Sequence, residues 1–170
     1  SPEALQAHMD YFQRRGVRKI FGGLITIRLR DGANWFVIDE MDEAPSAPIG
    51  ADLWERFQAQ DVLTSEDDLD LLTLKVKLPA NVVLVQESTP SGRGWVIKKI
   101  YLERRAALPR RLAFDSETAA FITKLDGSQT LNDAVAAFAK QRKHPRPQTV
   151  DVCLRLVKKL ASLGLVTFEA

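Results

Sequence analysis

The chain has 170 residues, 45% of them hydrophobic, which suffices for the core of one medium-sized domain or of two small ones. The net charge is +2, yet residues 111–170 alone hold nine Lys and Arg against six Asp and Glu, an excess of three. The chain has one cysteine and two histidines, which are too few for a disulfide framework or a set of metal ligands. Neither a membrane-spanning run nor a signal peptide is recognisable, which predicts a cytoplasmic protein without a membrane contact.

The first part of the chain predicts a helix followed by a β-hairpin. Apolar residues recur at helical spacing over 1–15, before a glycine that stops the helix. Two apolar runs, 19–30 and 34–40, flank the turn signal Asp31-Gly32 and indicate paired strands. The prolines at 45 and 48 then favour a loop and a break.

The middle part predicts helices and then a β-meander. Apolar spacing indicates a helix over 51–60, and Ser65 with the acids after it opens a short second helix. Three runs with strand patterns follow, at 72–78, 81–87 and 94–102. We interpret Gly92-Arg93-Gly94, between the last two runs, as a hairpin turn rather than a phosphate loop, since no helix follows it.

The last sixty residues predict three helices and a terminal strand. Each helix has its own start signal, at Asp115, Thr130 and Pro147. Asp126-Gly127 is expected to stop the first helix and Gly164 the third, with 165–168 as the strand. This order of elements favours a winged-helix-like module, a class that usually binds a partner.

We therefore expect an α+β fold: a small antiparallel sheet unit with flanking helices, then a C-terminal winged-helix-like domain. Three parts are predicted, namely 1–45 (helix plus β-hairpin), 46–110 (α+β meander unit) and 111–170 (winged-helix-like domain). Because the chain begins at Ser1 without an initiator methionine, and Ser1-Pro2 is a good start for a helix within a longer protein, we also expect it to be a fragment.

The basic residues of the last part are the main candidate site, for binding nucleic acid. The seven residues expected to contact phosphates are Lys140, Arg142, Lys143, Arg146, Arg155, Lys158 and Lys159. They lie between the second and third helices or along the third, the usual reading surface of a winged helix. The alternative is that they are ordinary solvated charges near helix ends.

Other chemistry-bearing residues favour structural roles. Trp35, Trp54 and Trp95 each sit in an apolar pattern, which predicts core packing rather than a contact surface. The acids at 39–43 match no cation-binding loop. No nucleophile with a histidine partner, glycine-rich cofactor loop or close carboxylate pair is present, so we predict no catalytic, cofactor-binding or metal-binding residue. Cys153, on an apolar helix stripe, is expected to be a buried structural thiol.

Several segments resemble the end of the catalytic domain in a group of bacterial S-adenosylmethionine-dependent methyltransferases of class I. The quoted segments are 11–17 (YFQRRGV), 21–30 (FGGLITIRLR) and 34–36 (NWF). In that group a last helix leads into an antiparallel strand pair that closes the catalytic sheet. The strands at 81–87 and 94–102 and the run Leu125-Asp126-Gly127 are similar to the C-terminal extension of the same group.

The resemblance implies a catalytic methyltransferase domain upstream in the same protein. The group's glycine-rich cofactor loop and its Asn-Pro-Pro-Tyr type motif do not occur here. S-adenosylmethionine would then bind the full-length protein, and this chain alone is predicted to be inactive. It would be a substrate-recognition or regulatory region that positions RNA or a protein.

A second function stays open. The chain is alternatively a winged-helix binding module unrelated to methyl transfer, either a DNA-binding regulator or a peptide-binding adaptor. The last part also resembles small peptide-binding modules in which a leader segment adds to a strand edge. A regulator would need a dimer with fixed half-site spacing, and an adaptor would need an open sheet edge.

Overall fold

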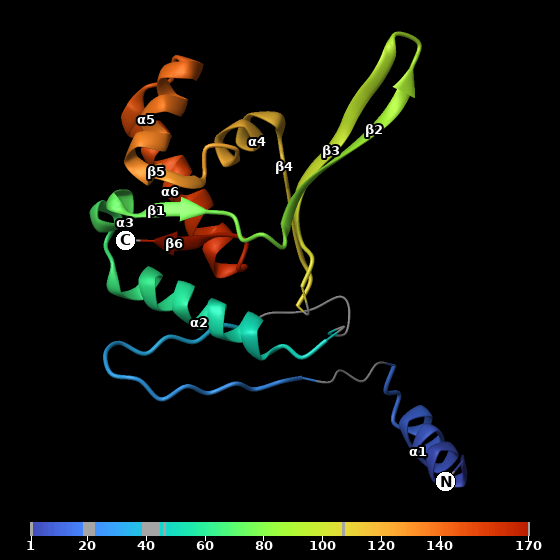
Figure 1. Cartoon of the computed structure of the whole chain (residues 1–170). Coiled ribbons are helices and arrows are strands. Elements are labelled where there is room, and N and C mark those ends of the chain that lie inside the picture. Colours follow the sequence, from blue (N-terminus) through green and yellow to red (C-terminus); the bar gives the residue numbers. More distant parts are fainter. Residues whose placement is uncertain (1, 19–22, 39–44, 46, 107, 170) are drawn as a thin grey trace. The chain divides into compact units, whose positions relative to one another are not determined.

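The computed structural model describes residues 2–18, 23–38, 45, 47–106 and 108–169. They divide into two compact units, 1–32 and 33–170. The elements, labelled as in Figure 1, are α1 (Pro2–Arg14), α2 (Gly50–Ser65), α3 (Asp68–Thr73), β1 (Lys75–Lys77), β2 (Val82–Ser91), β3 (Gly94–Arg104), β4 (Arg110–Phe114), α4 (Ser116–Ile122), β5 (Asp126–Thr130), α5 (Leu131–Arg142), α6 (Arg146–Ser162) and β6 (Thr167–Glu169). Two small antiparallel sheets with flanking helices confirm the α+β class.

The helix predicted for the first part is confirmed as α1, but the hairpin prediction is wrong for the residues that the structure describes. Residues 23–38 contain no strand, and positions 19–22, 39 and 40 of the two predicted strands lie outside the described part. A two-stranded ribbon is marginal unless a further element buries its apolar face. The side chains of Ile25 and Leu29 are 86% and 99% exposed, so no described residue covers that face.

The second unit contains two sheets. One has the order β2–β3–β4, in which β4 pairs only with Ile100–Arg104 of the longer β3. The other has the order β5–β1–β6, with β1 in the centre. The predicted meander is therefore corrected: β1 pairs with β5 and β6 instead of β2, and β4 is the third strand beside β2 and β3. A turn after β1, in which Val82 N donates to Pro79 O (2.9 Å), separates the first strand from the second.

The three helices and the terminal strand predicted for the last part are confirmed as α4, α5, α6 and β6. Asp115 caps α4 by accepting from Thr118 N (2.7 Å), and Thr130 caps α5 by accepting from Asp133 N (3.2 Å). The strand β5 differs from the prediction, since Asp126-Gly127 both follows α4 and begins a strand. In the described chain one strand follows α6, and its neighbour is β1 rather than the second strand of a C-terminal hairpin.

One apolar core joins the elements of the second unit. Its fully buried side chains include Leu71 of α3, Val76 of β1, Leu102 of β3, Phe121 of α4 and Leu160 of α6. Residues from both sides of position 110 thus fill the same interior. Burying apolar side chains in one contiguous cluster is the main driving force that holds the two sheets to the helices.

The three tryptophans do not share the predicted core role. Trp35 is half-buried, with its ring 5.4 Å from that of Phe57 and its indole N–H donating to Asp61 Oδ1 (3.1 Å). Trp54 and Trp95 are 54% and 74% exposed, which contradicts the prediction for both. Trp95 is exposed because it lies on the part of β3 that extends beyond β4.

Candidate nucleic-acid interface

The helices α5 and α6 are joined by a short turn that the local sequence determines. Lys143 has a φ of 56°, the left-handed conformation typical of a helix C-terminus, and its backbone N–H bonds back to α5. His144 N donates to Ala139 O (3.1 Å), and α6 begins at Arg146 after Pro145. The turn places the end of α5 directly before the positive end of the α6 dipole.

Three of the seven predicted contact residues gather at the end of α5. Lys140 and Arg142 lie in its last turn and Lys143 follows as the cap, all exposed. The Arg142 guanidinium lies 6.0 Å from the centre of the Phe138 ring, which restricts its orientation. Within the described residues none of the three forms a close ion pair, although the charge of Arg142 contributes to lowering the pKa of Asp115. We call these three residues the α5 end cluster.

Arg146 does not point toward the α5 end cluster. Its Nη2 donates to Asn132 Oδ1 (2.8 Å) in the first turn of α5. Asn132 precedes Arg142 by ten residues, which corresponds to about 15 Å along a helix axis. The guanidinium of Arg146 is thus held near the opposite end of α5 by a neutral partner.

The three predicted contact residues in the second half of α6 differ in whether they form an ion pair. Arg155 forms an exposed i, i+4 ion pair with Asp151 (2.8 Å), and Lys158 forms an ion pair with Asp68 of α3. Lys159 is exposed and has no acidic partner among the described residues. Exposed ion pairs are weak, so Arg155 is still accessible to a phosphate, whereas Lys158 mainly links α6 to α3.

A second exposed basic region, which the sequence reasoning missed, lies on the β2–β3 ribbon. The two strands run side by side beyond the end of β4 and project from the rest of the unit (Figure 1). The projecting half, 88–99, includes the exposed Trp95 and three cations, at Arg93, Lys98 and Lys99. The predicted hairpin turn is confirmed, because Ser91 pairs with Gly94. The strands β2 and β3 are 10 and 11 residues long, about twice the length of β4 (5 residues), so half of the ribbon has no third strand. The predicted runs at 81–87 and 94–102 do not reveal this difference in length.

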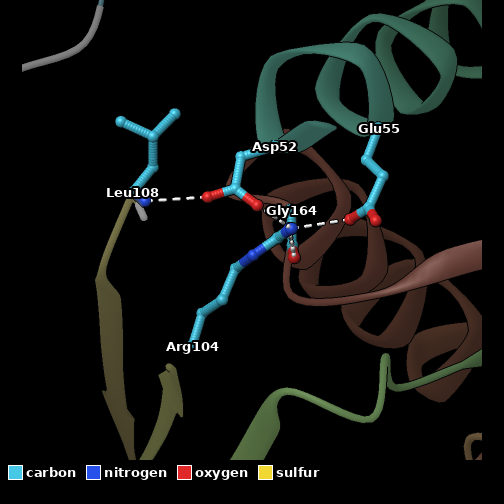
Figure 2. A network of polar contacts seen from close by, with 5 residues as sticks. All are labelled: Asp52, Glu55, Arg104, Leu108 and Gly164. Carbon is cyan, nitrogen blue, oxygen red and sulfur yellow. Dashed lines mark hydrogen bonds and ion pairs between the residues drawn. The ribbon is translucent and has the colours of Figure 1, made fainter. Parts of the chain in front are cut away.

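A buried arginine fixes the base of this ribbon (Figure 2). Arg104, at the end of β3, is 2% exposed, and its Nη2 donates to Asp52 Oδ1 (2.9 Å) and Glu55 Oε2 (2.6 Å) of α2. Its Nη1 donates to the carbonyl of Gly164 (2.6 Å) just after α6, and Asp52 also accepts from Leu108 N (2.8 Å). The network therefore joins β3, α2, the end of α6 and the segment before β4.

Charges at the base of the ribbon are neutralised within the sheet. Arg111 donates to Glu103 Oε1 from Nη2 (2.7 Å) and Nε (3.0 Å), and its guanidinium lies 5.7 Å from the centre of the Tyr101 ring. The hydrogen bond from Arg111 holds the pKa of Glu103 below its usual value. Desolvation, together with Glu87, raises the pKa of Tyr101. Arg111 is thus engaged here, whereas the cations further out on the ribbon are not paired with Glu103.

No arrangement of catalytic groups was found in the part of the chain that the structure describes. A hollow of about 250 Å³ lies between α2 and β6, but its one charged lining residue, Glu55, already accepts from Arg104. No three His, Cys, Asp or Glu residues among those described are grouped to hold a metal ion. Cys153 is buried, and burial raises the pKa of its thiol to about 12, as expected for a structural cysteine.

Comparison with known proteins leaves the family open. No protein-family model matches the sequence, and no similar curated protein was found. Among the described helices, none has both the length and the hydropathy needed to cross a bilayer. The chemistry of the exposed basic regions is therefore the basis for a functional proposal.

Proposed function

We propose that this chain is the substrate-recognition region of an S-adenosylmethionine-dependent methyltransferase and that it holds a nucleic acid for a catalytic domain upstream. The observation that supports binding is the α5 end cluster: three exposed cations within the last turn of α5 and its cap, none of them in a close ion pair among the described residues. Such cations gain most from a phosphate, since no internal ion pair competes for them. The cofactor and the reacting groups would belong to the upstream domain, and the protein would act in the cytoplasm.

The extended residues of the first part support an upstream domain. In the first unit, Ile25, Ile27 and Leu29 alternate along an extended segment and are at least 86% exposed. In the second unit, Phe36 and Ile38 show the same alternation with exposures of 85% and 80%. Period-two apolar stripes are typical of strands that are half-buried in a larger sheet. A catalytic sheet that these segments complete, as in the methyltransferases that they resemble, would bury them.

Salt-dependent RNA binding tests the proposal. We expect K140A/R142A/K143A to weaken binding of a labelled single-stranded RNA by about 10- to 100-fold at ~0.1 M salt, measured by fluorescence anisotropy. The slope of log K against log salt should fall by about 2, since each lost phosphate contact on a single strand contributes about 0.7.

A control variant of equal charge separates specific contacts from net charge. R14A/R15A/R18A also removes three exposed cations, none of them in the predicted surface, and should leave the isotherm within about twofold. If both variants lost the same affinity for RNA, the loss would be due to the overall charge and not to contacts of the α5 end cluster. An unchanged isotherm for K140A/R142A/K143A would contradict the proposal.

A peptide-binding adaptor is the second candidate, and one observation favours it. Beyond β4, the Gly94–Lys99 edge of β3 has no neighbouring strand within the described residues. An extended peptide could pair with such an edge. A titration with a peptide library, read by chemical-shift changes along β3, distinguishes this function from RNA binding. The DNA-binding regulator requires a dimer, which sedimentation would detect.

A further inference from the structure

The projecting half of the β2–β3 ribbon has the composition of a contact surface. From Ser88 to Lys99 it contains three cations and no acid. Arg93, Lys98 and Lys99 are exposed, and none of them forms an ion pair among the described residues, although Glu87 lies opposite Lys99 in the ladder. Elsewhere in the second unit most basic side chains of the sheets have acidic partners, as in the pair between Arg111 and Glu103.

The aromatic group on this surface is unusually accessible. Trp95 is 74% exposed, sits opposite Pro90 across the ribbon, and is followed two residues later by Ile97, 49% exposed. Residues two apart in a strand share a face, so the indole and the isoleucine form one exposed apolar strip. A ring left in water gains no stabilisation from burial, whereas a flat aromatic ligand would cover it.

We propose that this ribbon binds single-stranded nucleic acid, with the Trp95 ring stacking on a base and Arg93, Lys98 and Lys99 contacting phosphates. The proposal rests on the function proposed above, that the chain holds a nucleic acid. It supplies the element that the α5–α6 surface lacks, an exposed ring beside unpaired cations. A base must be unstacked to meet a side-chain ring, which makes a single strand the expected partner rather than a duplex.

The ribbon is less suited to a peptide strand. A β-bulge between Glu87 and Ser88 shifts the register at Lys98, which breaks the regular ladder along the ribbon. Gly94 has a φ of 123°, outside the extended region that a continuous edge requires. Lysines on an edge strand also oppose edge-to-edge pairing. Three like charges without an acid select a polyanion by electrostatic complementarity.

The experiment compares a nucleic acid with an anionic polymer that lacks bases. Wild-type protein is titrated into labelled oligouridine of about 12 nucleotides and, separately, into labelled polyphosphate. We expect W95A to weaken oligouridine binding by about 5- to 150-fold and to leave polyphosphate binding unchanged. W95F should retain most of the affinity because its ring still stacks, and R93A/K98A/K99A should weaken both ligands.

Two checks keep the result interpretable. W54F replaces the other exposed tryptophan and should bind like wild type, and quenching of tryptophan fluorescence by oligouridine should disappear in W95F. Circular dichroism of each variant verifies folding, which is expected to persist because Trp95 packs against no core residue.

The outcomes separate the two proposals. If W95A binds oligouridine as wild type does while K140A/R142A/K143A loses binding, the ribbon proposal is wrong and the proposed function stands. If wild type binds no oligouridine, both are wrong. Preference for duplex over single strand, or capture of an acidic peptide along β3 in place of oligouridine, would also overturn the ribbon proposal.

Discussion

Arg104 shows how a single residue can set the position of a projecting element. Its guanidinium is buried among two carboxylates and a carbonyl, so the base of the ribbon is tied to α2 and to the end of α6 (Figure 2). Gly164 is required beside it, because its φ is +69° and an added Cβ would lie 2.6 Å from Arg104 Nη1. The buried guanidinium of Arg104 therefore depends on a glycine at position 164, and the position of the ribbon depends on both residues.

Removing Arg104 should destabilise the second unit strongly. In Arg104→Met, Asp52 stays buried and loses its ion pair, which typically costs about 3–5 kcal/mol of the free energy of unfolding. Urea denaturation followed by circular dichroism measures the loss. Arg105→Met is the matched control, since that side chain is 66% exposed, and it should change stability by less than about 0.5 kcal/mol. Equal losses for both variants would contradict a special role for the buried network.

At the scale of the elements, the N-terminus of α4 is stabilised by one capping residue, Asp115. The carboxylate of Asp115 accepts from Thr118 N (2.7 Å), and this hydrogen bond is the main reason that the pKa of Asp115 is lowered. A group whose pKa is lower in the folded state stabilises the fold above its unfolded pKa. That contribution is lost as the pH falls through the folded value.

We expect Asp115→Ala to lower the free energy of unfolding by about 1 kcal/mol at pH 7. The difference from wild type should shrink as the pH falls below the ordinary aspartate pKa of 3.8, because the cap becomes protonated. Denaturation at several pH values measures it. Asp115→Asn keeps an acceptor without a titrating group, so it should stay near wild type at pH 7 and lack this pH dependence. A pH-independent difference for Asp115→Ala would refute the linkage.

At the scale of the whole second unit, the sheet β5–β1–β6 joins residues far apart in sequence. Its central strand, β1, begins 35 residues before Arg110, yet it hydrogen-bonds with β5 and β6 of the last part. Leu131 N also donates to Leu74 O (2.8 Å), which continues this attachment into α5. The last sixty residues thus depend on a strand outside them.

A chain beginning at Arg111 should therefore not fold, whereas residues 33–170 should. Without β1 and Leu71, Val76 and Leu102, the shorter chain loses its central strand and part of its core. Near-ultraviolet circular dichroism and urea denaturation are the measurements. We expect a cooperative transition for 33–170 and none for 111–170. A cooperative transition for the shorter chain would mean that the last part is an independent domain.

The sequence by itself determined the elements whose signals are local. Asp115 and Thr130 predicted the starts of the helices that they cap, and Gly164 predicted the end of α6. Gly92-Arg93 predicted the turn of the ribbon. These predictions are confirmed because caps and turns depend on a few neighbouring residues. The seven candidate cations could be named in the same way, as charges near helix ends.

The tertiary structure decided everything that depends on distant partners. It placed β1 between β5 and β6, buried Arg104 while leaving Trp95 exposed, and paired Lys158 with Asp68 while leaving Lys140 without a described acid. Strand pairing, burial and ion pairing join residues that are far apart in the chain. A pattern of neighbouring residues therefore does not predict them. Which cations are available to a ligand is therefore a property of the folded molecule.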